Sequence, residues 1–300
     1  MNKKRITHDL LPALIFLLPG LALFLIFFLG PMGYSLNISF YRWNIVHPEQ
    51  SQFVGLQNYV NTLKSTIFQR AVLNTVVYTL VTVLLQMAFA LGLALLLNKP
   101  FRGRGFFRTA YYLPVISSWV IVSLLFEYLF NGQAGYVNYI LKNVLHLVNK
   151  NILWLGDDKL AMVPLAALGV WKGVGWSMVI YLAGLQSIPQ ELYEAAQVDG
   201  ANAWEQMRFV TLPMLRSTLT FLLVVLVIGG LNAFISFQLM TNNGDPVNLT
   251  HSVLTWMYKT AFDVGRDFGS GAAISYLLTI FVFVISILQL KLLRRPAEEY

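Results

Sequence analysis

Long stretches without charged side chains restrict the possible folds of this chain more than any other feature. Five stretches contain no charge, at residues 10–41, 71–98, 109–126, 217–244 and 268–290, and a sixth, at about 161–186, contains only Lys172. A helix of roughly 20 apolar residues crosses the hydrocarbon core of a bilayer. Charged residues make up 12% of the chain, about half of what a soluble domain carries. We therefore predict an all-α, polytopic membrane protein with six helices, near residues 11–32, 72–97, 107–130, 161–186, 214–240 and 271–293.

The first stretch also has to be weighed as a signal peptide, because Lys3, Lys4 and Arg5 precede it. It is longer than the apolar part of a signal peptide, and no small-residue cleavage site follows it. We predict a retained membrane helix. The chain has no cysteine, which excludes disulfides and thiolate metal sites.

Basic residues predict the orientation in the membrane. Twelve lie in short segments on one side: Lys3, Lys4, Arg5, Lys99, Arg102, Arg104, Arg108, Arg208, Arg216, Lys291, Arg294 and Arg295. The positive-inside rule places this side, and with it both termini, in the cytoplasm. The outer loops are then about 33–71, 131–160 and 241–270. Because the basic residues are dispersed between apolar stretches, the net charge of +7 does not indicate a nucleic-acid partner.

One inner connection, residues 187–216, is long enough to form structure of its own. Ser187 and Gln190 have the spacing of a capping box, and Gly200 is placed to end the helix that follows. Asn202 and Glu205 repeat the capping spacing and predict a second short helix through about Val210. The small and apolar side chains of this helix–turn–helix allow two interpretations of equal weight. The loop either docks on a partner protein or lies on the membrane as an amphipathic segment.

The amino-acid sequence of this loop resembles that of a known coupling element. EAAQVDGA at 194–201 and VTLP at 210–213, preceded by IPQELY, resemble the EAA loop of the permease subunits of ABC importers. Weaker matches to the sugar-importer permeases follow in the expected order along the chain: FVGLQNY at 53–59, NT at 74–75, YLP at 112–114, WKGVGW at 171–176, AGLQSIP at 183–189 and TNNGDP at 241–246.

The resemblance implies the type I ABC importer permease fold and a transport function. It implies a permease that forms the path for a sugar or sugar-like solute across a bacterial or archaeal cytoplasmic membrane by alternating access, with a non-sugar solute such as glycerol phosphate as the alternative. The implied partners are a second permease, two cytoplasmic ATPase subunits that bind ATP and magnesium, an extracytoplasmic solute-binding protein and membrane lipid. In that family the EAA loop docks in a cleft of the ATPase, and here this role falls to Glu194, Ala195, Ala196, Asp199 and Gly200.

We divide the chain into three parts on this basis. Residues 1–70 form the first helix and first outer loop, residues 71–293 form a five-helix core containing the coupling loop, and residues 294–300 form a cytoplasmic tail.

Polar groups inside the predicted spans are candidates for the substrate path, because they are costly in a bilayer. Lys172 lies near mid-membrane and either pairs with a neighbouring helix or a backbone carbonyl, or lines a cavity. Gly229, Asn232 and Ser236 have the spacing of one helical face, which fits a packing seam or a translocation path. Trp176, like Trp171, either stacks on a sugar ring or anchors the helix at the interface.

Other patterns bear on packing and on competing functions. Gly169 and Gly173 have the GxxxG spacing that allows close helix approach. The sequence has no P-loop, no HExxH motif and no GxSxG motif, so we predict no enzymatic activity, cofactor or metal on this chain. An ion-coupled carrier would need carboxylates deep in a span, and Glu127 lies near a span end. An intramembrane enzyme or a receptor would leave the 187–210 loop without a role.

Overall fold

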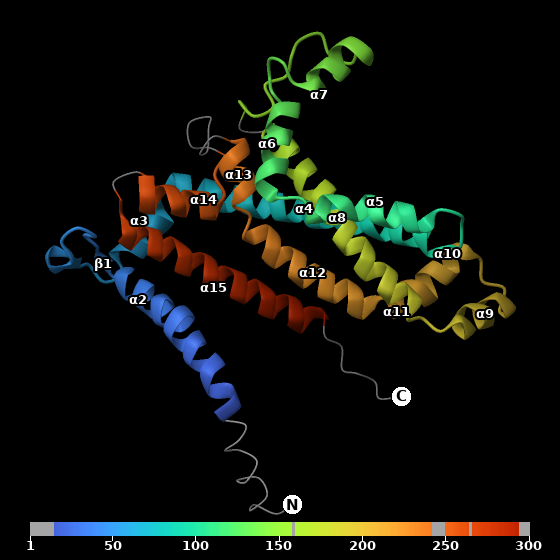
Figure 1. The fold of residues 1–300 in the computed structure, drawn as a ribbon, viewed down its shortest axis with the longest axis horizontal. Coiled ribbons are helices and arrows are strands. Elements are labelled where there is room, and N and C mark those ends of the chain that lie inside the picture. The colour runs from blue at the N-terminus through green and yellow to red at the C-terminus, as the bar shows by residue number, and fades with distance from the viewer. Residues whose placement is uncertain (1–14, 158–159, 242–249, 264–265, 294–300) are drawn as a thin grey trace, which may run out of the picture. The chain divides into compact units, whose positions relative to one another are not determined.

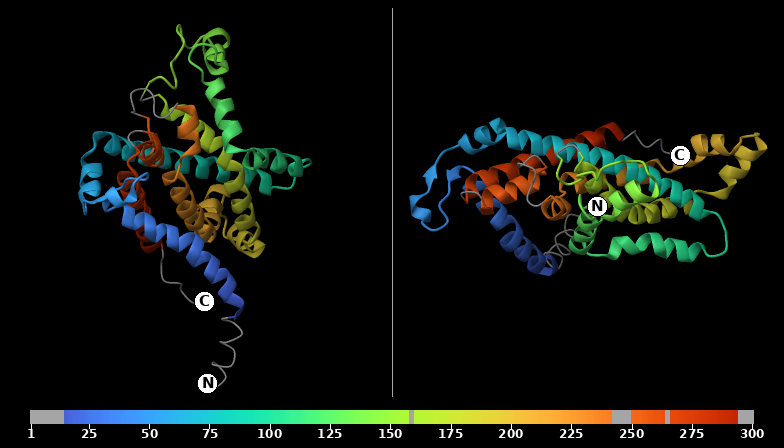
Figure 2. Two further views of the ribbon diagram at one scale, coloured as in Figure 1. Left: turned by 60° about the vertical axis from the view of Figure 1, so that its left-hand side comes forward. Right: turned by 90° about the horizontal axis from the view of Figure 1, so that it is seen from above.

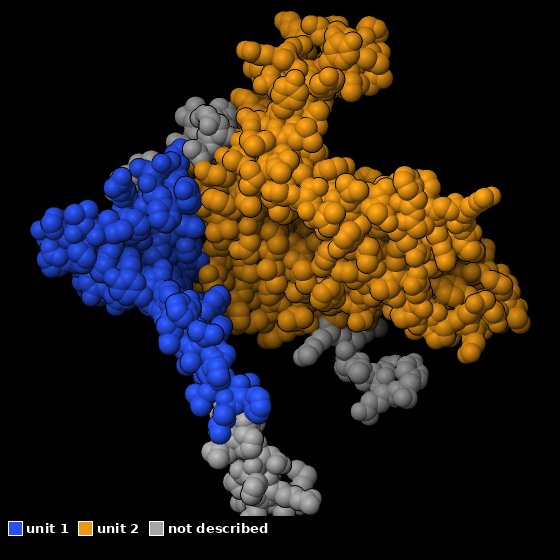
Figure 3. All heavy atoms as spheres, viewed as in Figure 1, with its two compact units in different colours: residues 1–64, 257–277 blue, residues 65–256, 278–300 orange. Residues whose placement is uncertain are grey.

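The computed structural model describes residues 15–157, 160–241, 250–263 and 266–293, and helices dominate them (Figure 1). The chain forms two compact units, one of residues 1–64 and 257–277 and the other of residues 65–256 and 278–300 (Figure 3). The basic residues before Ile15, the tail 294–300 and most of the TNNGDP run lie outside the described residues.

Helices of the first unit begin with one apolar helix at Ile15–Ile38, which includes a π-helical turn η1 at Leu25–Leu29 and helix α2 at Gly30–Ile38. It ends six residues later than predicted, where the Ser39 hydroxyl donates to the Leu36 carbonyl at 2.6 Å. Helix α3 follows at Gln57–Lys64, and a π-helical turn η5 lies at Lys259–Asp263.

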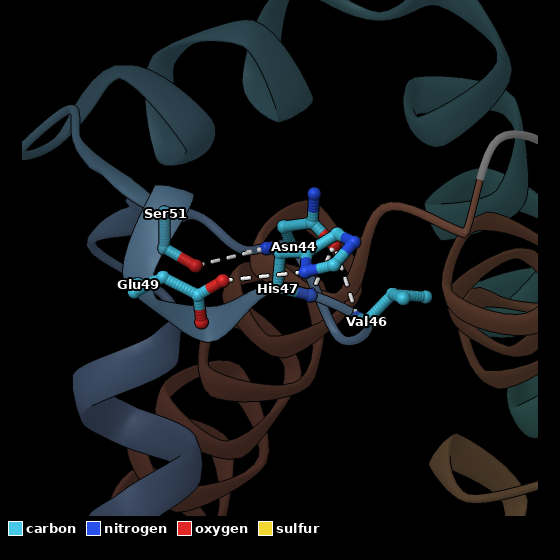
Figure 4. A network of polar contacts seen from close by, with 5 residues as sticks. All are labelled: Asn44, Val46, His47, Glu49 and Ser51. Carbon is cyan, nitrogen blue, oxygen red and sulfur yellow. Dashed lines mark hydrogen bonds and ion pairs between the residues drawn. The ribbon is translucent and has the colours of Figure 1, made fainter.

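A small hairpin is the only β structure in the described part of the chain. It pairs β1 at Tyr41–Arg42 with β2 at Gln52–Phe53, and a 3-10 turn η2 at Pro48–Gln50 lies between them. Figure 4 shows how the Asn44 side chain accepts hydrogen bonds from the amides of Val46 and His47, both at 3.0 Å. This local bonding is typical of an Asn-initiated turn. Asn58 fastens the first strand by donating to the Ser39 and Tyr41 carbonyls, each at 2.9 Å.

The second unit contains the remaining spans, and its helices run in chain order as follows: α4 at Thr66–Asn98, α5 at Arg104–Ile116, α6 at Trp119–Leu129, α7 at Tyr136–Tyr139, η3 at Ile140–Val144, α8 at Met162–Gln186, α9 at Gln190–Val198, α10 at Ala203–Gln206, η4 at Met207–Thr211, α11 at Leu212–Met214, α12 at Arg216–Leu231 and α13 at Ile235–Met240. Helices α14 at Val253–Tyr258 and α15 at Phe268–Leu293 each have residues in both units.

The number of spans agrees with the sequence prediction. Five helices among the described residues are long and apolar enough to cross a membrane, and α5 with α6 makes a sixth span if this bent pair is counted as one. The fold is therefore a multi-span helical membrane protein.

Close packing of α4 against α8 forms the centre of the second unit. A Cβ atom on Gly169 would lie 2.6 Å from the Tyr78 hydroxyl, and one on Gly173 would overlap the Gln86 side chain. The GxxxG spacing thus allows close approach within this chain, as its pattern predicts. Gln86 also joins the two helices, because its Nε2 donates to the Gly173 carbonyl at 2.9 Å and to the Ser177 hydroxyl at 2.8 Å.

The prediction of one continuous third span at 107–130 is wrong. Helix α5 contains Pro114 and ends at Ile116, the backbone becomes extended at Ser117, and α6 starts at Trp119 after a bend of 95°. The bend is visible in Figures 1 and 2, where α6 leaves the direction of α5. Hydropathy did not reveal it, because apolar residues adjoin the break on both sides and no charged residue marks it. Such a break exposes main-chain carbonyls that a bilayer cannot hydrate.

The fifth span is interrupted too, so the expectation that Gly229, Asn232 and Ser236 share one helical face is wrong. Helix α12 ends at Leu231, and α13 begins at Ile235. The Asn232 side chain bonds back to the Ile228 carbonyl at 2.8 Å, and the Ser252 hydroxyl donates to the Ala233 carbonyl at 2.8 Å. The Ile228 carbonyl also accepts from the Asn232 amide, so Ser252 is the side chain that supplies a bond to a carbonyl in the break itself.

Candidate functional site: a cavity between the spans and a protruding inner loop

A cavity of about 340 Å³ lies in the second unit between α4, α8 and α12. The break between α5 and α6 adds Val115 and Trp119 to its wall. Its polar lining residues are all at least nine-tenths buried, and they are Tyr78, Thr82, Gln86 and Lys172. Since buried polar groups in a membrane protein are costly, their convergence on one hollow marks it as the candidate path for a polar solute.

Lys172 combines two features that the sequence left as alternatives. Its side chain lines the cavity, and its ammonium nitrogen lies 2.9 Å from the Pro114 carbonyl, 3.3 Å from that of Val115 and 2.6 Å from that of Ser117. The same nitrogen lies 5.0 Å from the centre of the Trp119 ring, within the range of a cation–π interaction. Pairing with backbone carbonyls is therefore what the structure shows for this lysine.

The two tryptophans of the WKGVGW run have different surroundings. Trp176 is partly buried and lines the cavity. Trp171 is 46% exposed and packs on Phe126, with ring centres 5.6 Å apart. Only Trp176 of this pair is placed to meet a solute in the cavity.

Asn232 and Ser236 are not among the residues that line this cavity. Asn232 is exposed at the end of α12, and Ser236 is buried in α13, where it hydrogen-bonds to Tyr78. Glu127 lies in α6, partly buried and away from the cavity lining. The structure thus brings together Lys172 and Trp176 of the candidates, and not Asn232 or Ser236.

Sequence reasoning missed four important residues of the cavity: Tyr78, Thr82, Gln86 and Trp119. Gln86 carried a usable signal, because an amide in the middle of a long uncharged span is costly unless it has partners. Trp119 carried none, since its place on the wall depends on the bend before it.

The connection at residues 187–216, which the sequence places on the inner side, forms the expected helix–turn–helix, with one local difference. Asn202 and Glu205 form a complete capping box at the start of α10. The capping box predicted for Ser187 is wrong: α9 begins after Pro189 without a side-chain cap, and the Ser187 hydroxyl donates instead to the Gly184 carbonyl at 2.8 Å. Ser187 remains attached to the end of α8, so its side chain is not available to α9.

Gly200 ends α9 in the left-handed conformation that the sequence predicts. Its φ is +82°, and its amide donates to the Gln197 carbonyl at 3.0 Å. The next amide, of Ala201, donates to the Ala196 carbonyl at 2.8 Å. These two bonds are those of a Schellman motif, which favours glycine at this position.

The loop exposes an unusual amount of apolar surface. Glu194, Ala195, Asp199 and Gly200 are exposed, and Ala196 is partly buried. Three large apolar side chains on the same loop are more than two-thirds exposed: Val198, Trp204 and Phe209. Tyr193 on α9 is joined to η4 within the same loop by a 3.0 Å hydrogen bond between its hydroxyl and that of Thr211. An exposed apolar surface of this kind indicates an interaction site.

Comparison with known proteins identifies the family. The model for the "Binding-protein-dependent transport system inner membrane component" family matches residues 86–297. The chain is 32% identical to the probable ABC transporter permease protein YurN of Bacillus subtilis, covering 95% of this chain and 97% of YurN. It is 34% identical to the lactose transport system permease protein LacF of Rhizobium radiobacter, covering 92% and 91% of the two chains.

A solved structure supports the same assignment over almost the whole length. The chain superposes with a TM-score of 0.80 on a chain from the crystal structure of a bacterial ABC transporter involved in the import of the acidic polysaccharide alginate, at 25% identity and with 98% and 99% of the two chains covered. A second structure of the alginate transporter, in complex with alginate pentasaccharide-bound periplasmic protein, matches equally well. The chain therefore belongs to the family of binding-protein-dependent transport system inner membrane components and is a multi-pass permease subunit of an ABC transporter.

Proposed function

We propose that this permease forms the translocation path for a sugar or sugar-like solute across the cytoplasmic membrane of a bacterium or archaeon, by alternating access. The observation that carries the proposal is the cavity between α4, α8 and α12. Its buried hydroxyl and amide groups and its tryptophan rings are the groups that replace water around a sugar. The described residues place no carboxylate on its wall.

The names of the relatives support a sugar over another solute. LacF is named for lactose, and the arabinooligosaccharides transport system permease protein AraP of Bacillus subtilis is 32% identical to this chain, covering 93% of it. Glycerol phosphate is the alternative solute and is less well supported. An ion-coupled carrier is disfavoured by membership of a binding-protein-dependent family.

The proposal assigns the remaining tasks to partners. A solute-binding protein delivers the sugar from outside, a second permease completes the path, and two ATPase subunits hold ATP and magnesium in the cytoplasm. Both termini lie on the cytoplasmic side. Glu194, Ala195, Ala196, Asp199 and Gly200 form the surface that docks on the ATPase, and the exposed apolar side chains beside them support this role. The chain itself is a transport subunit, with no catalytic residue or cofactor of its own.

Filling the cavity should stop transport without preventing insertion. A Cβ atom on Gly229 meets nothing within 4 Å, and Gly229 lines the cavity. Gly229→Phe should therefore place its ring in the hollow and lower the uptake rate at least about tenfold, because pockets of roughly 300–1,000 Å³ lose their ligand when a large side chain occupies them. The measurement is uptake of radiolabelled lactose, arabino-oligosaccharides and glycerol 3-phosphate by cells that express the complete importer.

The matched control is Gly92→Phe on α4, which is exposed, away from the cavity, and also has open space at its Cβ position. Uptake should stay within about twofold for this variant, since substitutions at open surface sites cost little. Equal uptake by the Gly229 variant and the control, at equal amounts in the membrane, would exclude this cavity as the path. If the intact importer takes up glycerol 3-phosphate and neither sugar, the transported solute is glycerol phosphate, the alternative named above.

A further inference from the structure

Lys172 occupies an unusual position for a charge inside a membrane protein. Its side chain is 4% exposed, and no carboxylate among the described residues lies within ion-pair distance of it. Its partners are three main-chain carbonyls and one aromatic ring. All of them belong to the segment around the break between α5 and α6, which lies 53 to 58 residues earlier in the chain.

Two of the three carbonyls, those of Val115 and Ser117, receive no main-chain amide at the break, whereas the Pro114 carbonyl also accepts from the Ser117 amide at 3.2 Å. In a continuous helix the carbonyls of Pro114, Val115 and Ser117 would accept from amides four residues later. The extended backbone at Ser117 and the 95° bend remove those amides from reach. An ammonium group has three N–H donors, and here three carbonyl oxygens surround it at 2.6 to 3.3 Å. Its donors are therefore occupied by the break itself.

We propose that Lys172 is a positioning residue: its ammonium replaces the missing amide donors at the break, and this holds Val115 and Trp119 on the wall of the cavity. Lys172 acts on transport through the shape of that wall, and it does not bind the transported solute. The consequence for transport rests on the function proposed above, whereas the role at the break does not.

The geometry distinguishes a donor role from a role of charge alone. Three carbonyls converge on one nitrogen, which suits the compact ammonium of lysine and not the flat, forked guanidinium of arginine. Lys172→Arg keeps the charge and should still disturb the break. Lys172→Met removes both the charge and the donors at similar size. A residue that only attracts solute by its charge would tolerate arginine.

Thiol labelling tests the position of the wall without any transport. The chain has no cysteine, so a single Val115→Cys substitution gives a unique probe, and Tyr139→Cys in the exposed outer segment α7 gives a reference. With Lys172 intact, a water-soluble maleimide should label position 115 at least about fivefold more slowly than position 139, because Val115 is only partly exposed and lies within a membrane span, whereas Tyr139 is 57% exposed. With Lys172→Met or Lys172→Arg, labelling at position 115 should rise at least about fivefold, because carbonyls that lose their donors draw water into the break.

Three labelling results would overturn the proposal. The first is equal labelling of positions 115 and 139 in the chain that keeps Lys172. This result can be obtained even if neither lysine variant accumulates in the membrane. The second is an unchanged rate at position 115 in both lysine variants, and the third is a rate that rises with methionine but not with arginine.

Uptake kinetics separate positioning from solute binding. For the sugar that the intact importer takes up fastest, both variants should lower kcat about tenfold and change KM by less than about threefold. A rise in KM with kcat preserved would overturn the proposal, because it would make Lys172 a binding residue. If no sugar is transported by the intact importer, the proposed function fails, while the labelling result still decides the role of Lys172 at the break.

Discussion

Replacing Glu194 with lysine should abolish sugar uptake while the permease still inserts in the membrane and assembles. Glu194 is exposed on α9, in the surface that we assign to the ATPase contact. Charge reversal in a desolvated interface costs about 2–5 kcal/mol, so uptake should fall at least about 30-fold. The measurement is uptake together with solute-stimulated ATP hydrolysis by the reconstituted importer.

The matched control is Glu191→Lys, the same charge change on the same helix but outside the EAAQVDGA run. It should lower uptake by less than about threefold, since a lysine in the first turn of a helix costs about 0.3–1 kcal/mol. Normal uptake and normal stimulated ATP hydrolysis with Glu194→Lys would contradict the coupling role of the loop.

Gly200 offers an independent variant of the same test. Its φ of +82° is strained for a β-branched residue but tolerated by asparagine. Gly200→Val should therefore disturb the turn and lower uptake, and Gly200→Asn should largely retain it. Equal uptake by the two variants would mean that the shape of this turn does not matter for coupling.

Substitution of Gly175 should have the largest effect on the amount of folded protein. A Cβ atom there would overlap the Tyr111 carbonyl oxygen and lie 3.1 Å from the Tyr112 Cα, and both are backbone atoms of α5. Since a backbone cannot rotate away as a side chain can, α5 would have to move off α8. Overpacking costs about 1–3 kcal/mol and more at a rigid contact, so Gly175→Ala should lower the amount in membranes several-fold and Gly175→Leu at least about tenfold.

Gly92 provides the control for this effect, because its added Cβ atom meets nothing within 4 Å. Gly92→Ala should be neutral or slightly stabilising, since alanine favours a helix by about 1 kcal/mol over glycine. The amount of each variant in membranes and its thermal unfolding in detergent are the measurements. If Gly175→Ala matched Gly92→Ala in both the amount in membranes and the unfolding temperature, the structure's close contact between α5 and α8 would be contradicted.

The span count and the inner loop were predictable because their causes are local. An uncharged stretch of about 20 residues favours the bilayer whatever its neighbours are. The turn at Gly200 and the cap at Asn202 depend on bonds between residues at most five positions apart. Ser187 shows the limit even of local patterns: the same spacing occurs there, but the side chain bonds backward to the end of α8.

The helix breaks and the cavity were not predictable, because distant residues determine them. Pro114 alone does not predict a 95° bend, since a proline in a membrane helix is tolerated when neighbours satisfy the freed carbonyls. At this break the neighbour is Lys172, and at the fifth span it is Ser252, 19 residues after the carbonyl it binds.

The uncharged stretches of the sequence therefore determine how many times the chain crosses the membrane. Transfer of an apolar segment into hydrocarbon depends on that segment's own composition, so the sequence alone decides it. Only the tertiary structure decided where the third and fifth spans break. It also decided which side chains meet in the cavity. An interrupted helix in a bilayer needs donors for its free carbonyls, and here Lys172 and Ser252 supply them from distant segments, which requires the packed bundle.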